Sequence, residues 1–155
     1  MIIIDTREKP KAIKSITDYF DRNGIEYMRS KLIAGDYMDF GNPSVIVDRK
    51  QTIAELAKNC TIEKGRFLAE IHRARCLGVD LVILVEQSRY KSGDRWITVN
   101  TIWDLYLWSN KYSTIRGEEI MRTLAYWTNK YPFRVEFCDR RTTGKRIIEL
   151  LEVKK

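Results

Sequence analysis

The spacing of apolar residues along the chain changes between the period of a strand and the period of a helix. Short apolar or alternating runs predict strands at Met1–Asp5, Tyr27–Ile33, Asp36–Phe40, Ser44–Lys50, Leu81–Glu86 and Phe133–Phe137. Apolar residues three and four apart predict six helices. The first opens at Pro10, the second opens at Thr52, and the third runs through Ile62. The fourth starts near Asn100, the fifth follows Gly117, and the last contains Ile147. This order of strands and helices indicates an α/β sandwich with a mixed sheet.

Two short signals mark where elements begin. Gly41-Asn42-Pro43 is a strong turn signal, which predicts that the third and fourth strands form a hairpin. Thr52 and Glu55 have the Thr-x-x-Glu spacing of a capping box, so a helix is expected to start there. Because no repeat, low-complexity tract or Gly/Ser-rich linker interrupts the chain, we expect a single domain.

The composition limits the class of protein. With 44% hydrophobic and 32% charged residues, the chain is expected to be a soluble globular domain. Its apolar runs are too short to cross a membrane and it has no recognisable signal peptide, which predicts an intracellular protein. Three scattered cysteines and one histidine support neither a disulfide framework nor a zinc site. The net charge of +7 fits either a solvated surface or a polyanionic partner such as nucleic acid.

The predicted hairpin carries two acids that face each other. If the turn is symmetric about Asn42, the cross-strand pairs are Phe40 with Ser44, Met38 with Ile46, and Asp36 with Asp48. Directly opposed residues have Cβ atoms only ~5 Å apart, so the two carboxylates would repel each other. Because side chains alternate along a strand, Lys50 is expected on the same face as Asp48, and Arg49 on the opposite face.

A divalent cation would remove this repulsion. Mg²⁺ or Mn²⁺ prefers oxygen ligands and keeps several waters, so the carboxylates of Asp36 and Asp48 suit it. Such an ion activates a bound water and stabilises charge on a phosphate while the Lys50 ammonium assists, which is the apparatus for phosphodiester hydrolysis. The alternative is structural. Asp36 would then be a turn residue after Gly35, and Asp48 and Lys50 an ion pair at a solvated strand end.

The wider pattern resembles the nuclease domain of the XPF family of structure-specific endonucleases. The similar segments are, in order, Asp5-Thr6-Arg7-Glu8, Leu32–Tyr37, Val45–Lys50 and Lys64–Phe67, within a similarity that covers nearly the whole chain. The family signature is Gly-Asp followed by Glu-Arg-Lys-x-x-x-Asp, and the wider restriction-endonuclease-like superfamily is marked by Asp and then Asp/Glu-x-Lys. The resemblance implies one XPF-type nuclease domain over residues 1–155, with a central mixed sheet flanked by helices on both faces.

The resemblance also implies a role for each residue of the motif. Asp36 and Asp48 would bind Mg²⁺ or Mn²⁺ together with the backbone carbonyl of Arg49, and Lys50 would assist the attacking water. Asp48 stands where the family usually has Glu, a change that keeps the carboxylate ligand but shortens its arm by about one bond. The site is therefore expected to stay active.

Residues outside this core are assigned less directly. Asp5, Arg7 and Glu8 are implied to line the same catalytic cleft; the structural alternative is a turn residue followed by a surface ion pair. Ala54 stands where the family has its last Asp, and Glu55 comes one position later. We expect Glu55 to cap a helix rather than to replace that acid.

Basic and aromatic residues predict contacts with partners. The residues implied to contact DNA phosphates, rather than only to make the surface soluble, are Arg66, Arg140, Arg141, Lys145 and Arg146. The tryptophans and tyrosines from Trp96 to Tyr131 are expected mostly in the core or at a subunit interface, because XPF-type nuclease domains dimerise through this region. Stacking on unpaired bases is the alternative for them.

These features predict a metal-dependent DNA endonuclease. The expected substrates are branched, flap or junction DNA in repair, recombination or replication. A homodimer is expected, with no membrane association and no nucleotide cofactor, since no phosphate-binding Gly-rich motif occurs. The small stand-alone form suggests a phage-encoded protein, placed in a host cytoplasm, or otherwise a protein of the cytoplasm or nucleoid. The alternative is a catalytically silent DNA-binding or scaffold subunit of the same fold.

Overall fold

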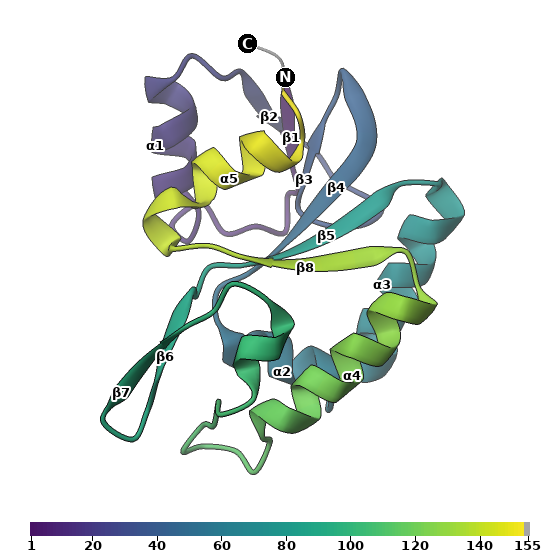
Figure 1. Ribbon diagram of the computed structural model, residues 1–155. Coiled ribbons are helices and arrows are strands. Elements are labelled where there is room, and N and C mark those ends of the chain that lie inside the picture. The colour runs from purple at the N-terminus through teal and green to yellow at the C-terminus, as the bar shows by residue number, and fades with distance from the viewer. Residues whose placement is uncertain (154–155) are drawn as a thin grey trace.

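A six-stranded mixed sheet forms the centre of the protein, whose computed structural model describes residues 1–153 (Figure 1). In spatial order the strands are β2 (Tyr27–Arg29), β1 (Ile2–Ile4), β3 (Tyr37–Asp39), β4 (Asn42–Lys50), β5 (Asp80–Val85) and β8 (Phe133–Phe137). Strand β3 is antiparallel to both neighbours, β1 and β4, while the other neighbouring pairs are parallel. The expected mixed sheet is confirmed; residues 154 and 155 of the expected domain lie outside the described part.

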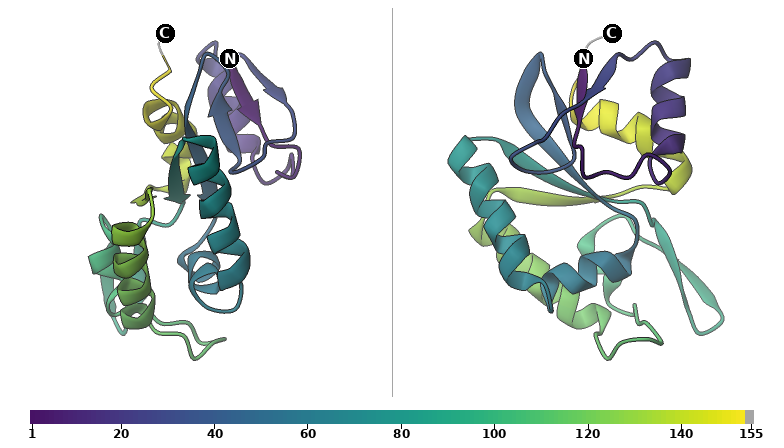
Figure 2. Two further views of the ribbon diagram at one scale, coloured as in Figure 1. Left: turned by 90° about the vertical axis from the view of Figure 1, so that its right-hand side faces the viewer. Right: turned by 180° about the vertical axis from the view of Figure 1, so that it is seen from behind.

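Helices cover both faces of this sheet, as expected. The helices are α1 (Lys14–Arg22), α2 (Ile53–Cys60), α3 (Lys64–Leu77), α4 (Gly117–Lys130) and α5 (Thr143–Leu150). Helices α1 and α5 share one hydrophobic core with the sheet, and α2, α3 and α4 share a second core. Figure 1 shows the first pair in the upper part of the view and α3 and α4 in the lower part, and Figure 2 shows the same division from behind.

The two central strands explain why the sheet separates two cores. In β4, Val45 and Val47 belong to the core of α1 and α5, whereas Ile46 belongs to the core of α2, α3 and α4. Residues Leu81–Val85 of β5 are all buried, since helices cover both of their faces. A continuous apolar run is therefore the correct signal for a parallel strand in the middle of the sheet.

Several predicted boundaries are wrong for local reasons. Helix α1 begins at Lys14 rather than at Pro10, because the Lys9 carbonyl accepts from the N–H groups of Ala12 and Ile13 and closes a separate turn first. Strand β2 ends at Arg29, and the chain then leaves the sheet. Ile62, which was expected inside a helix, lies between α2 and α3 and is 81% exposed.

The segment between β5 and α4 was predicted least well. It contains an unexpected hairpin of β6 (Arg89–Ser92) and β7 (Arg95–Thr98), and only a 3-10 turn at Ile102–Leu105 where a longer helix was expected. In β6 only Tyr90 is buried, and its hydroxyl donates to the Asp104 carbonyl at 2.7 Å. A hairpin with so few buried residues leaves little apolar periodicity in the sequence.

The β3–β4 hairpin has the predicted register over most of its length. Met38 pairs with Ile46 and Tyr37 with Val47, while Asp36 lies just beyond the paired residues and its N–H donates to the Val47 carbonyl at 2.8 Å. The predicted pair of Phe40 with Ser44 is wrong, because the register shifts after Met38 and the Phe40 N–H donates instead to the Met1 carbonyl at 2.9 Å. The shift lies at the turn, far from the two acids.

Two glycines near helix starts are expected to respond oppositely to a methyl group. At Gly117 a Cβ would lie 1.7 Å from the Leu105 carbonyl oxygen, whereas at Gly65 nothing lies within 4 Å. We expect Gly117→Ala to lower the free energy of unfolding by at least ~1–3 kcal/mol through overpacking. Gly65→Ala should raise it by up to ~1 kcal/mol, since alanine favours the helix. Chemical denaturation measures both; equal effects would contradict the close packing of α4 on the 3-10 turn.

Candidate active site

The site begins where β3 and β4 separate. The Asp36 N–H donates to the Val47 carbonyl at 2.8 Å, and Oδ2 of Asp36 accepts from the Arg49 N–H at 2.8 Å. Just beyond the last β3–β4 pair, Asp36 is thus bonded to β4 twice, through its backbone N–H and through its carboxylate. Burial and the neighbouring Asp48 raise the pKa of Asp36 well above its usual value, against the opposing effects of the Arg49 N–H and Lys50. The predicted approach of the two carboxylates is therefore present.

Asp48 and Lys50 point to the same face of β4, as the alternation predicts. Asp48 is buried, and its Oδ2 lies 2.6 Å from the Lys50 ammonium. Burial lowers the pKa of Lys50, but the Asp48 carboxylate outweighs this effect, so that the pKa is raised and Lys50 stays charged. This short ion pair is the contact that balances the buried charge of Asp48.

Arg49 lies on the opposite face, in a buried ion cluster. Its guanidinium is 2.7 Å from Oε2 of Glu8 and 2.7 Å from Oε2 of Glu86. The Tyr37 hydroxyl also donates to Oε2 of Glu8, at 3.1 Å. Glu8 is therefore held by Arg49, while Glu86, at the end of β5, was not singled out from the sequence. An acid that ends a buried apolar strand is the signal that could have found it.

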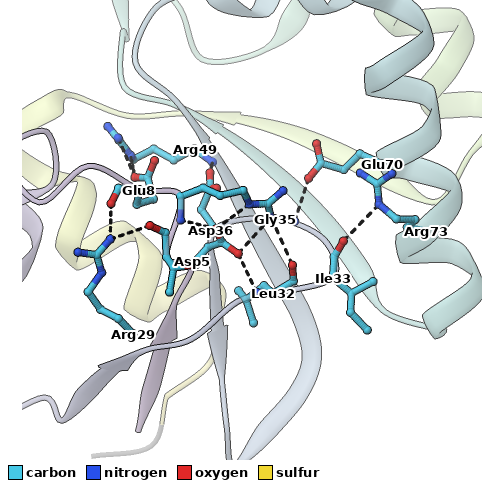
Figure 3. Close-up of polar contacts among 12 residues, drawn as sticks. Asp5, Glu8, Arg29, Leu32, Ile33, Gly35, Asp36, Arg49, Glu70 and Arg73 are labelled. Atoms are coloured by element: carbon cyan, nitrogen blue, oxygen red, sulfur yellow. Dashed lines mark hydrogen bonds and ion pairs between the residues drawn. The ribbon is translucent and has the colours of Figure 1, made fainter.

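Asp5 fixes the loop that leads to Asp36 (Figure 3), and Arg7 donates to the Leu32 carbonyl of that loop at 3.4 Å. Asp5 is fully buried and accepts from the N–H groups of Arg7 and Leu32, both at 2.7 Å. Burial raises the pKa of Asp5, but the hydrogen bonds from Arg7 and Leu32 outweigh it and the net pKa is lowered. The bond to Leu32 also explains why the predicted strand at Tyr27–Ile33 ends early. Asp5 is thus occupied by protein donors, whereas Arg7 lines the cleft beside the site.

Gly35 allows the loop to approach β4 closely. Its φ is +64°, a conformation that favours glycine, and an added Cβ would lie 2.1 Å from Cγ2 of Ile46. Its N–H donates to Oε1 of Glu70 on α3 at 2.9 Å. In the Gly35-Asp36 pair, the glycine therefore permits the backbone conformation of the loop, and the aspartate supplies the carboxylate of the site.

A polar cleft of about 400 Å³ opens beside these groups, between the end of β4 and helices α2 and α3. The lining residues are Arg7, Lys50, Glu55, Asn59, Glu63, Arg66, Phe67, Ala69, Glu70 and Arg73. Asn59, Glu70 and Arg73 were not singled out from the sequence, because only the packing of α2 and α3 brings them to the cleft. Glu55 caps α2: its N–H donates to Oγ1 of Thr52 at 3.1 Å, and its Oε2 accepts from the Gln51 N–H at 2.8 Å.

The basic residues predicted to contact DNA are divided between two regions. Arg66 is at the cleft, and its side chain is 86% exposed. The group at Arg140–Arg146 belongs to α5 and the turn before it, in the half of the fold that contains α1. There Arg141 pairs with Asp139 at 2.9 Å, and Arg146 contacts Glu136 and Glu149, each at 3.0 Å. The structure does not bring this group into the cleft.

The donor set suits a hard divalent cation. Within the described part of the chain no three His, Cys, Asp or Glu side chains are grouped closely enough to hold a metal by themselves. Asp36 and Asp48 would instead supply two carboxylates, and the peptide of Arg49 lies directly beside them, beyond the last β3–β4 pair. Mg²⁺ commonly takes one or two carboxylates and keeps its waters. The observation that supports this fit is the closeness of the two carboxylates, by which Asp48 helps to raise the pKa of Asp36.

Asp36 is expected to destabilise the metal-free protein. Its raised pKa means that the folded state resists ionisation, so stability falls as the pH rises from the unfolded Asp value of about 3.9 through the folded pKa. Asp36→Asn, which keeps an acceptor for the Arg49 N–H, should therefore be more stable than wild type at pH 7 in a chelator, by ~0.5–2 kcal/mol. Thermal unfolding from pH 4 to pH 8 measures this difference, which should grow with pH.

Asp5→Asn is the control of opposite sign. The lowered pKa of Asp5 stabilises the folded protein above the unfolded pKa, and this contribution is lost as the pH falls through the folded value. Asp5→Asn should therefore reduce stability at pH 7. A pH-independent difference between wild type and Asp36→Asn would contradict the electrostatic account.

Comparison with known proteins agrees with this geometry. Residues 4–151 match the model of the ERCC4 domain family. The solved structure of XPF from Aeropyrum pernix is similar to this chain with a TM-score of 0.66 and 21% identity, covering 97% of this chain and 63% of that one. The same archaeal protein in complex with DNA gives a TM-score of 0.66 and 19% identity, with 97% and 62% covered. The chain thus spans less than two thirds of these solved chains, and no curated protein matches it. The chain belongs to the ERCC4 domain family.

Proposed function

We propose that this domain, residues 1–155, is a metal-dependent DNA endonuclease that hydrolyses phosphodiester bonds in branched, flap or junction DNA. One observation carries the proposal: the carboxylates of Asp36 and Asp48 lie close enough that Asp48 helps to raise the pKa of Asp36, and the Lys50 ammonium is 2.6 Å from Asp48. Two neighbouring acids that share one ammonium are unfavourable for folding alone, so they favour a chemical role. Membership in the ERCC4 domain family supports it.

The residues divide the work as follows. Asp36, Asp48 and the Arg49 carbonyl would hold Mg²⁺ or Mn²⁺, which when bound supplies an activated water and stabilises charge on the phosphate. Lys50 stays protonated and orients the water or neutralises a phosphate oxygen. The Glu8–Arg49–Glu86 cluster fixes β4 from its opposite face, so that Asp48 and Lys50 keep their positions. Arg7 and Arg66, at the cleft, would contact the DNA backbone.

Several features support DNA as the substrate. The chain carries a net charge of +7, and the archaeal XPF with the same fold has been solved in complex with DNA. We propose an intracellular role in repair, recombination or replication; no helix within residues 1–153 is long and apolar enough to cross a membrane. Exposed aromatic residues offer a surface for a second copy of the chain, as a homodimer requires. These residues are Trp96, Trp103, Tyr106, Tyr112 and Tyr126.

A catalytically silent DNA-binding subunit is the second candidate. Two observations favour it: Ala54 offers no acid, and the described residues contain no cluster of three metal-binding side chains. Such a subunit would bind DNA but would bind no Mn²⁺ through Asp36 and Asp48. Calorimetry with Mn²⁺ on wild type and Asp48→Asn therefore separates the two candidates.

Asp48→Asn tests the enzyme directly. Removing this carboxylate should reduce Mg²⁺- or Mn²⁺-dependent cleavage of labelled flap, fork and four-way junction DNA by at least ~100-fold, because both the ion and the activated water depend on it. Glu118→Gln is the matched control, since it removes an exposed acid on α4 that pairs with Arg122. If wild type cuts none of these substrates, or if Asp48→Asn cuts as well as wild type, the proposal is wrong.

Two equally exposed arginines test which face receives DNA. The side chain of Arg66 at the cleft is 86% exposed, and that of Arg141 near α5 is 87% exposed. Arg66→Ala should weaken binding to all DNA sequences and reduce the slope of log affinity against log salt by about 1. Arg141→Ala should change binding less. The reverse order, measured by fluorescence anisotropy, would place the phosphate contacts on the α1–α5 half of the fold.

A further inference from the structure

The wall of the cleft formed by α2 and α3 contains a buried amide that is only half satisfied. Asn59 is 7% exposed, and its Nδ2 donates to Oε2 of Glu63 at 3.2 Å. Its Oδ1 is buried and accepts no hydrogen bond within residues 1–153. Buried polar atoms are normally satisfied, so an unpartnered acceptor in a polar cleft points to a missing donor.

Glu70, on the same wall, links this side of the cleft to the two acids. Its Oε1 accepts from the Gly35 N–H at 2.9 Å, directly before Asp36 (Figure 3). It also lines the cleft together with Lys50 and Asn59. Arg73, one helical turn later, donates from its Nε to the Ile33 carbonyl at 3.2 Å. Among the described residues, Glu70 therefore has no direct ion pair with Arg73. Glu70 therefore presents a second oxygen close to the place where Asp48 lies.

The chemistry of this wall selects its ligand. The free groups of Asn59 and Glu70 are hydrogen-bond acceptors. Phosphate oxygens of DNA are acceptors too, so they cannot satisfy these groups. Water bound to a divalent cation is a strong donor, and a cation held by only two carboxylates keeps several such waters. A hydrated cation therefore supplies both the charge and the donors that the wall lacks.

We propose that Asn59 and Glu70 are positioning residues that accept hydrogen bonds from the water ligands of the cation held by Asp36 and Asp48. This inference rests on the proposed function, because it needs the same cation. Asn59 is on α2 and Glu70 is on α3, so both helices would contribute to the surroundings of the ion. Such outer contacts commonly change metal affinity by about 10- to 100-fold.

Mn²⁺ titration calorimetry, with thermal unfolding of each metal-free variant, tests this assignment. Asn59→Leu should weaken Mn²⁺ binding by about tenfold without lowering the melting temperature of the metal-free protein, because it removes an unsatisfied buried acceptor. Glu70→Gln should weaken binding by about the same factor, since its amide oxygen can still accept from Gly35 while the charge is lost. Glu55→Gln is the matched control, as Glu55 lines the same cleft but its carboxylate caps α2.

Each result gives a definite answer. Mn²⁺ affinity equal to that of wild type in Asn59→Leu and Glu70→Gln overturns the inference, and so does an equal loss in Glu55→Gln, which would indicate only the total charge of the cleft. A lower melting temperature of Asn59→Leu with unchanged affinity would make Asn59 a packing residue. If wild-type binding is absent, or insensitive to Asp48→Asn, the proposed function itself fails, which is a different result from failure of these variants alone.

Discussion

The repulsion between two carboxylates on adjacent strands is the constraint on which the site depends. Asp36 lies just beyond the last β3–β4 pair, and the neighbouring Asp48 helps to raise its pKa. Neighbouring residues limit this repulsion without removing it. The Arg49 N–H donates to Asp36, and the Lys50 ammonium lies 2.6 Å from Asp48, yet the pKa of Asp36 stays raised. The folded protein therefore holds free energy that a bound cation would release.

Strand alternation separates this reactive pair from a structural ion cluster. Lys50, which pairs with Asp48, lines the cleft, whereas Arg49 between them contacts Glu8 and Glu86. The buried guanidinium satisfies two carboxylates with short contacts, as a structural cluster requires, because an unpaired buried charge is strongly unfavourable. Three consecutive residues thus serve two purposes. Exchanging the faces by a shift of one residue would destroy both.

The sequence predicted the parts that depend on local pattern. The Met38–Ile46 pair and the approach of Asp36 to Asp48 follow from one turn signal and the period of a strand. The Phe40–Ser44 pair failed because Phe40 bonds to Met1, a contact that no hairpin rule contains. Glu86, Asn59 and Glu70 were missed for the same kind of reason. Their neighbours at the site are supplied by the packing of separate elements, and single-sequence periodicity carries no information on that packing.

The absence of an acid at position 54 is compatible with a metal centre once α3 is considered. Glu55 is used as the cap of α2, so it does not replace an acid at Ala54. Another carboxylate near Asp48 is that of Glu70 on α3, which is distant from position 54 in the sequence but acts on Asp48 in the folded chain. A carboxylate can act on a hydrated ion from several directions, because the intervening waters transmit the contact. The position of the acid along the chain is therefore a weaker requirement than its place on the wall of the cleft.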